Sequence, residues 1–188
     1  MMSVYLPGKP RFKSAALDSF EPNVWIKISP DNKVIITLAK SEMGQGVKTA
    51  LPMIVADELD ADWQNVEVVQ ADAHPDKYGS MMTVGSRSVR GGAWMRLRET
   101  GATVREMLVS AAAKRWGVDS ASCRTENSSV YHDASNRTLT YGNLLSDASG
   151  QKVPKKPQLK DPSQFRYCLL YTSPSPRDAT LSRMPSSA

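Results

Sequence analysis

Two glycine-containing segments hold the residues of this sequence best suited to bind a ligand. The first, SEMGQG at residues 41–46, lies between a strand-like run and an apolar run with helical spacing. Gly44 and Gly46 let the backbone approach a ligand closely, and the first N–H groups of a helix favour negative charge. The amide of Gln45 suits the edge of an uncharged heterocycle or an oxo group. On spacing alone, a simple strand-to-helix turn is the favoured explanation of the same residues.

The second segment, TVGSRSVRGG at residues 83–92, immediately precedes another run with helical spacing. Its hydroxyl groups, together with the N–H groups of a helix start, suit a phosphate. The hydroxyl-bearing residues are Thr83, Ser86 and Ser88. Arg87 and Arg90 are candidate phosphate partners, although charges beside a loop are usually solvated. The alternative interpretation of the segment is a helix cap followed by a solvated loop.

The elements around these segments predict an α+β fold, a mixed sheet with two main helices packed on it. Alternating apolar residues predict a hairpin of strands 24–28 and 34–38, and a third strand at 66–70. Residues 71–90 are expected to be irregular. Three further short strands are predicted at 123–126, 130–132 and 138–140, followed by a short helix at 141–148.

Helical spacing predicts the first main helix from about Thr49 to Leu59, with Pro52 in its first turn, where a missing N–H costs nothing. Glu58 is expected on the polar side of this helix. The second helix is expected from Gly92 to about Trp116, with the apolar residues on one face and the charges on the other.

Composition narrows the function classes. The chain has 188 residues, 40% of them hydrophobic and 23% charged, with a formal net charge of +5. The basic residues are scattered rather than clustered with aromatics, which argues against nucleic-acid binding. No apolar run approaches the ~20 residues that span a membrane. The two histidines and two cysteines are isolated from one another, so no protein metal site is expected.

We expect four divisions of the chain: an extended leader (1–23), a ligand-binding α+β domain (24–149), a linker (150–167) and a tail (168–188). The Ser- and Pro-rich tail is typical of a disordered segment. A DNA sequence that resembles the transposon end and adapter of a short-read sequencing library would also translate into these residues. We therefore expect the tail to be a translated artefact, and the natural chain to continue beyond Tyr167.

Taken together, these segments resemble the molybdopterin-binding subunits of the xanthine dehydrogenase and aldehyde oxidase family, in particular the beta subunits of isoquinoline 1-oxidoreductases. The resemblance extends over residues 20–166. Its specific parts are SEMGQG with TALP at 49–52, then Thr83 with SRSVRG at 86–91, and later RWGV at 115–118 and CRTEN at 123–127.

The resemblance implies that the chain is a fragment of a molybdenum hydroxylase large subunit, which oxidises an N-heterocycle or an aldehyde with water as the oxygen source. The implied cofactor is molybdopterin with molybdenum, in its cytosine dinucleotide form. Electrons would pass to iron–sulfur clusters in a small [2Fe–2S] partner subunit. Carried over to this sequence, the cofactor-binding residues are Gly44, Gln45, Gly46, Thr83, Ser86, Ser88 and Gly91.

The chain also departs from this family. The family's general base is a glutamate near the far C-terminus of a longer subunit, so no catalytic residue is expected here and the chain alone should not turn over. The twin-arginine export signal is missing, and the compartment is periplasmic if that signal precedes Met1 and cytoplasmic otherwise. The remaining alternative is a non-catalytic α+β module that binds a small ligand or a protein.

Overall fold

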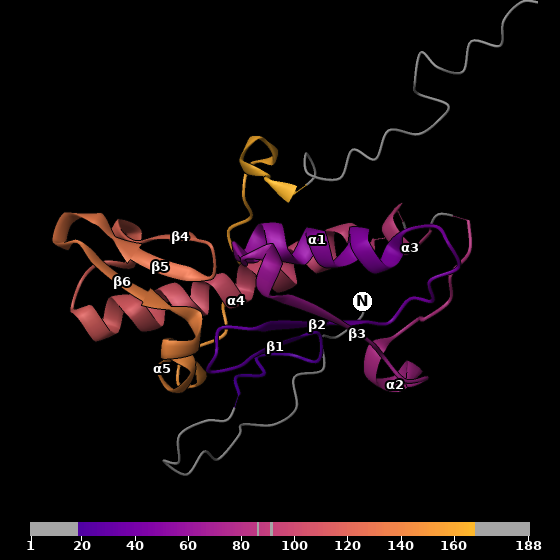
Figure 1. Ribbon diagram of the computed structural model, residues 1–188, viewed down its shortest axis with the longest axis horizontal. Coiled ribbons are helices and arrows are strands. Elements are labelled where there is room, and N and C mark those ends of the chain that lie inside the picture. The colour runs from indigo at the N-terminus through magenta and orange to yellow at the C-terminus, as the bar shows by residue number, and fades with distance from the viewer. Residues whose placement is uncertain (1–18, 86, 91, 168–188) are drawn as a thin grey trace, which may run out of the picture.

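A computed structural model of the chain describes residues 19–85, 87–90 and 92–167 (Figure 1). Several predictions concern residues outside these ranges. They are most of the leader, the whole tail (168–188), and two of the candidate cofactor ligands, Ser86 and Gly91.

The first sheet joins three strands in the order β1-β2-β3. Their bounds are β1 (Ile26–Ile28), β2 (Val34–Leu38) and β3 (Val66–Gln70). β1 and β2 form the predicted antiparallel hairpin, whereas β3 lies parallel to β2 with Val34 opposite Val66. A parallel neighbour requires a crossover connection, and the first main helix provides it. The predicted mixed sheet is therefore confirmed.

Two helices, α1 (Val47–Leu59) and α4 (Ala93–Trp116), pack on each other and cover one face of this sheet (Figure 1). Their contact is close at Gly101 of α4. A Cβ placed there would lie 2.6 Å from the carbonyl oxygen of Val55 and 2.9 Å from the Cβ of Glu58. Only a glycine therefore allows the two helix backbones to approach this closely. The predicted end of α4 is also confirmed, because Gly117 caps it in the left-handed region with φ 68°.

The remaining strands form a second, antiparallel sheet of their own beyond the C-terminal end of α1 (Figure 1). Its order is β4-β5-β6, with β4 (Arg124–Glu126), β5 (Ser129–His132) and β6 (Arg137–Thr140). The predicted short helix that follows is a 3-10 turn, η4 (Tyr141–Leu144), continued by α5 (Leu145–Ser149). The buried Tyr141 hydroxyl donates to the Leu59 carbonyl oxygen at 2.6 Å, which ties this part of the chain to α1.

The start of α1 differs from the prediction. The helix begins at Val47 rather than Thr49, so Pro52 lies inside it and not in its first turn. Because proline has no N–H, the Lys48 carbonyl loses its usual helical donor. The predicted irregular stretch 71–90 also contains two short helices, α2 (Pro75–Tyr78) and α3 (Arg87–Arg90).

Residues 150–167 contain no strand, only the 3-10 turn η5 (Pro162–Gln164), yet the segment is held firmly to the helices. Arg105 of α4 donates to the Gln158 carbonyl oxygen at 2.5 Å, and the Arg166 N–H donates to Asp57 of α1 at 2.7 Å. These contacts make the segment part of the folded body.

Candidate functional site

The two predicted ligand segments lie next to each other at the N-terminal end of α1. We call them the Gly–Gln–Gly turn (residues 41–46) and the hydroxyl segment (residues 83–92, of which the structure describes all but 86 and 91). The Lys40 ammonium donates to the carbonyl oxygens of Ser80 at 2.5 Å and Met82 at 3.0 Å. The Thr83 hydroxyl donates to the Ser41 carbonyl oxygen at 3.4 Å. Figure 1 shows α3 at this same end of α1. Segments about forty residues apart in sequence thus form one surface.

Glu42 organises the Gly–Gln–Gly turn. One oxygen of its carboxylate accepts the N–H groups of Gly44 at 2.7 Å and Gly46 at 3.0 Å, and the other accepts the Lys48 N–H at 2.8 Å. These N–H groups, that of Lys48 first, lower the pKa of the exposed Glu42 carboxyl below its ordinary value. Gly44 and Gly46 have φ angles of 91° and 81°, which only glycine adopts without strain. A single carboxylate therefore accepts one N–H group of the first turn of α1 and two N–H groups of the residues just before the helix.

Gln45 lies exposed between the two glycines. Its side-chain oxygen accepts the Met43 N–H at 2.6 Å, and its side-chain nitrogen donates to the Ser41 carbonyl oxygen at 2.8 Å. An amide has two donor hydrogens and two acceptor lone pairs. One donor and one acceptor position of Gln45 therefore remain for a ligand while the side chain keeps its present orientation.

The described residues of the hydroxyl segment differ in accessibility. Thr83 is partly exposed, and its hydroxyl contacts the carbonyl that Gln45 also uses. Ser88 is only 4% exposed, in the short helix α3, whereas its neighbours Arg87 and Arg90 are exposed. Of the two hydroxyl residues that the structure describes, Thr83 is thus the more accessible to a ligand.

Large apolar side chains are exposed around this end of α1. Met43 of the Gly–Gln–Gly turn is 69% exposed and Met82 is 65% exposed. Val84, Val89, Trp94 and Met95 are also exposed in the stretch that follows Met82, although the Trp94 ring packs against Phe165. Ligand sites typically combine such apolar walls with a few placed polar groups. The surface therefore has the composition of one wall of a ligand site.

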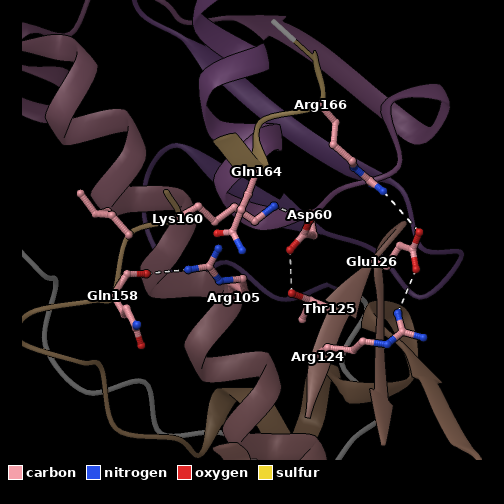
Figure 2. A pocket seen from close by; sticks show the side chains of 10 residues that line it. Asp60, Arg105, Arg124, Thr125, Glu126, Gln158, Lys160, Gln164 and Arg166 are labelled. Carbon is pink, nitrogen blue, oxygen red and sulfur yellow. Dashed lines mark hydrogen bonds and ion pairs between the residues drawn. The ribbon is translucent and has the colours of Figure 1, made fainter. Parts of the chain in front are cut away.

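A cavity of about 420 Å³ lies at the opposite end of α1, which is about 20 Å long by its number of residues (Figure 2). Its cations already have protein acceptors. Arg105 donates to the Gln158 carbonyl, Arg124 to Asp133 and Glu126, and Lys160 to Asp60. These contacts hold separate parts of the chain together around the cavity.

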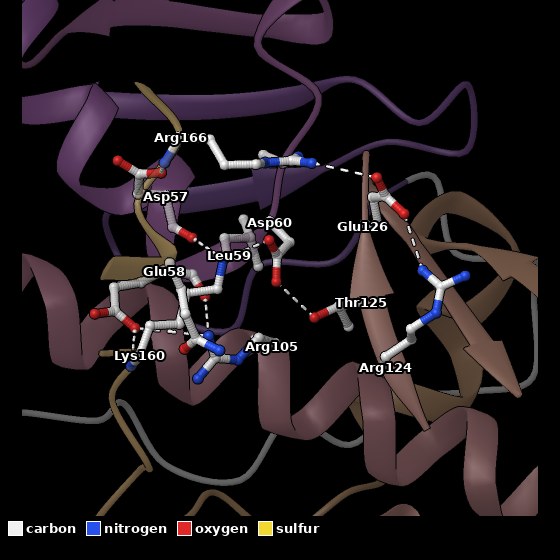
Figure 3. Close-up of polar contacts among 12 residues, drawn as sticks. Asp57, Glu58, Leu59, Asp60, Arg105, Arg124, Thr125, Glu126, Lys160 and Arg166 are labelled. Atoms are coloured by element: carbon white, nitrogen blue, oxygen red, sulfur yellow. Dashed lines mark hydrogen bonds and ion pairs between the residues drawn. The ribbon is translucent and has the colours of Figure 1, made fainter. Parts of the chain in front are cut away.

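Beside this cavity, Glu58 is fully buried rather than on a polar helix face, so the prediction for it is wrong (Figure 3). Its carboxylate accepts from the Arg98 guanidinium at 2.6 Å and from the Lys160 N–H at 3.1 Å. The buried Arg98 also shows that the charges of α4 do not all face solvent. Sequence periodicity missed this pair because it counts charged residues as surface residues.

The sequence model of one protein family, the molybdopterin cofactor-binding domain, matches residues 3–180 of the chain. The chain belongs to this family. Its curated relatives include the isoquinoline 1-oxidoreductase subunit beta of Brevundimonas diminuta, 40% identical over 69% of the chain and 17% of the relative. The membrane-bound pyrroloquinoline-quinone aldehyde dehydrogenase of Gluconacetobacter polyoxogenes is 35% identical over 68% of the chain and 16% of the relative. This chain thus spans only about a sixth of the length of these relatives.

Solved structures agree on the fold. Quinoline 2-oxidoreductase from Pseudomonas putida 86 superposes with a TM-score of 0.51 and 20% identity, over 67% of this chain and 16% of that one. The copper- and molybdenum-containing carbon monoxide dehydrogenase superposes with a TM-score of 0.50 and 23% identity, over 71% of this chain and 17% of that one. The predicted family, the α+β fold and the molybdopterin cofactor with molybdenum are therefore confirmed.

The residues at the N-terminal end of α1 fit part of a cofactor site. Gly44 and Gly46 have no atom within 4 Å of where a Cβ would stand, so a ligand can reach their backbone. On the same surface, Gln45 keeps one neutral donor position, and the Thr83 hydroxyl keeps acceptor positions while it donates to Ser41. The sequence did not single out Lys40 or Glu42, because their partners are carbonyl and N–H groups that leave no sequence pattern.

In the part of the chain that the structure describes, no helix has both the length and the apolar character to cross a membrane.

Proposed function

We propose that this chain forms one wall of the molybdopterin site of a molybdenum hydroxylase that oxidises an N-heterocycle or an aldehyde with water as the oxygen source. The observation that carries the proposal is the contact of the Thr83 hydroxyl with the Ser41 carbonyl, which Lys40 and Met82 support just outside the two segments. Family membership supports it, and so do the names of the relatives, which include an isoquinoline oxidoreductase, an aldehyde dehydrogenase and a nicotinate dehydrogenase subunit.

In this proposal Gln45 donates to the molybdenum and pterin end of the cofactor, and Gly44 and Gly46 let the backbone approach it. Thr83, with Ser86, Ser88 and Gly91 after it, holds the phosphate region. When bound, the cofactor supplies the two-electron oxidation of the substrate carbon. Its form is the cytosine dinucleotide, and electrons leave through a [2Fe–2S] partner subunit.

Neither Glu42, in the Gly–Gln–Gly turn, nor Glu58, at the other end of α1, is placed to act as the general base. The Glu42 carboxylate is held by three backbone N–H groups, and the Glu58 carboxylate is fully buried against Arg98. A base must reach the proton that it removes. We therefore propose that the base is supplied from outside these 188 residues, and that the chain alone has no hydroxylase turnover.

The test is cofactor loading in the complete subunit with Gln45→Ala. We expect molybdenum and pterin content, and hydroxylation of N-heterocycles, to fall at least about tenfold, as is typical when a hydrogen-bond partner of a metal site is lost. Gln64→Ala is the matched control, because Gln64 is exposed at the other end of α1. Equal loading in the two variants would contradict the proposal.

A binding module without catalysis remains the alternative, and genomic DNA around codon 167 separates the two. A long continuous reading frame with further glycine-rich motifs and a late glutamate supports the oxidoreductase. An in-frame stop soon after codon 167 supports the module. A genomic read that encodes residues 168–188 as given contradicts the proposal that they are an artefact.

A further inference from the structure

The start of α1 is bound by a carboxylate of the chain itself, that of Glu42. The sequence predicted that the N–H groups at this helix start are available to bind a ligand. In the structure the Lys48 N–H group of the first helical turn instead donates to the Glu42 carboxylate at 2.8 Å, as do the Gly44 and Gly46 N–H groups just before the helix at 2.7 and 3.0 Å. Gly46, the N-cap residue, has no side chain that could satisfy them. The place where a ligand phosphate would bind is therefore taken by a residue of the chain.

We propose that Glu42 is the positioning residue of the Gly–Gln–Gly turn, and that its carboxylate excludes phosphate from the start of α1. In its relation to the cofactor this inference rests on the proposed function. The two segments then bind different parts of the cofactor. The Gly–Gln–Gly turn contacts it through the neutral amide of Gln45. The phosphate region then falls to the hydroxyl segment, which precedes α4.

The geometry shows how one carboxylate sets the turn. Its two oxygens bridge residues 44, 46 and 48, so the chain on both sides of Gln45 is fixed. Both bridged glycines have positive φ angles, which glycine adopts without strain, so the carboxylate can bind both N–H groups in this conformation. The same negative charge repels a second anion at this helix end. Gln45 is thereby held on the surface that it shares with Thr83.

The test uses the 188-residue chain labelled with ¹⁵N, titrated with inorganic phosphate at constant ionic strength. In the native chain we expect the amide resonances of Gly44, Gly46 and Lys48 to stay unmoved. In Glu42→Ala, phosphate takes the place of the carboxylate and moves these three resonances saturably. A merely structural residue would not create phosphate binding when it is removed. Movement of the native resonances at the same phosphate concentration overturns the proposal.

A second measurement covers the case in which Glu42→Ala fails to fold. In Glu42→Gln one oxygen acceptor and the charge are lost, and we expect the amide hydrogens of Gly44, Gly46 and Lys48 to exchange roughly tenfold faster. Glu99→Gln, an exposed glutamate of α4, is the control and should match the native chain. Unchanged exchange in Glu42→Gln contradicts the positioning role. Neither measurement uses the cofactor. Both therefore test the role of Glu42 even if the proposed cofactor-binding function is wrong.

Discussion

At the scale of single residues, environment decides what each glutamate does. Glu42 is exposed and its carboxylate is bound by backbone N–H groups at a helix start. Glu58 is fully buried, and its carboxylate is paired with the Arg98 guanidinium. The residue type is the same in both places, and only the fold shows that the first shapes the candidate site while the second stabilises the helix pair.

The lowered pKa of Glu42 predicts a pH dependence for the Gly–Gln–Gly turn. A carboxyl whose folded-state pKa is depressed contributes stability that is present above its unfolded pKa and is lost as the pH falls through the folded pKa. We expect the amide resonances of Gly44 and Gly46 to titrate with a midpoint below the ordinary range of glutamate. A midpoint at the ordinary value would show that the carboxylate does not bind them.

Glu58→Gln tests the buried ion pair. Removing one partner leaves the Arg98 charge buried without compensation, and such losses cost about 3–5 kcal/mol. We expect the free energy of unfolding in urea to fall by that order. The control Glu99→Gln changes an exposed residue and should stay within about 0.5 kcal/mol of the native chain. Equal stability of the two variants would mean that Glu58 is not buried as described.

At the scale of elements, the contact of α1 with α4 determines where the candidate site can form. The Gly–Gln–Gly turn is fixed to the start of α1, and the hydroxyl segment runs into α4. The relative position of the two segments therefore depends on how closely the helices pack. Gly101 allows that packing, because α1 occupies the space of a side chain there.

Gly101→Ala tests this packing. Alanine favours a helix by about 1 kcal/mol over glycine, so propensity alone predicts a gain in stability. The Cβ would however stand 2.6 Å from the Val55 carbonyl oxygen, and overpacking costs about 1–3 kcal/mol. We expect a net loss in a thermal unfolding experiment.

The control for this experiment is Gly150→Ala. Its φ of −87° suits any residue, and its new Cβ would meet nothing nearer than 3.7 Å. A Gly101→Ala variant as stable as Gly150→Ala would contradict the close helix contact.

The sequence predicted the local elements well and the long-range contacts poorly. The hairpin, the third strand and the end of α4 at Gly117 follow from alternation and from a glycine stop, which are local signals. The internal position of Pro52 was missed, because apolar spacing alone did not show that the helix starts two residues earlier, at Val47, where the Glu42 carboxylate accepts the Lys48 N–H.

In the candidate site, too, the sequence predicted the local segments but not the long-range contacts between them. The sequence singled out Gln45 and Thr83, and the contact of the Thr83 hydroxyl with the Ser41 carbonyl places their segments together. Their roles toward a cofactor stay a prediction. The bridging contacts of Lys40 with Ser80 and Met82 could not be predicted, because any lysine can reach a carbonyl and only the fold decides which.

At the scale of the whole molecule, the two ends of α1 differ in character. The C-terminal end is closed by ion pairs and by residues 158–167, which bind back onto α1 and α4 (Figures 2 and 3). The N-terminal end exposes the apolar side chains Met43 and Met82 beside the candidate site. The chain spans about a sixth of the length of its relatives. We therefore propose that it forms only one wall of the molybdopterin site.

The most direct test of that account is an experimental structure of the complete subunit with its molybdenum cofactor bound. We predict that the cofactor lies at the N-terminal end of α1, with the Gln45 side-chain amide within hydrogen-bond distance of it and the Glu42 carboxylate still on the N–H groups of Gly44 and Gly46. A cofactor bound at the other end of α1, or away from this chain altogether, would contradict the central claim.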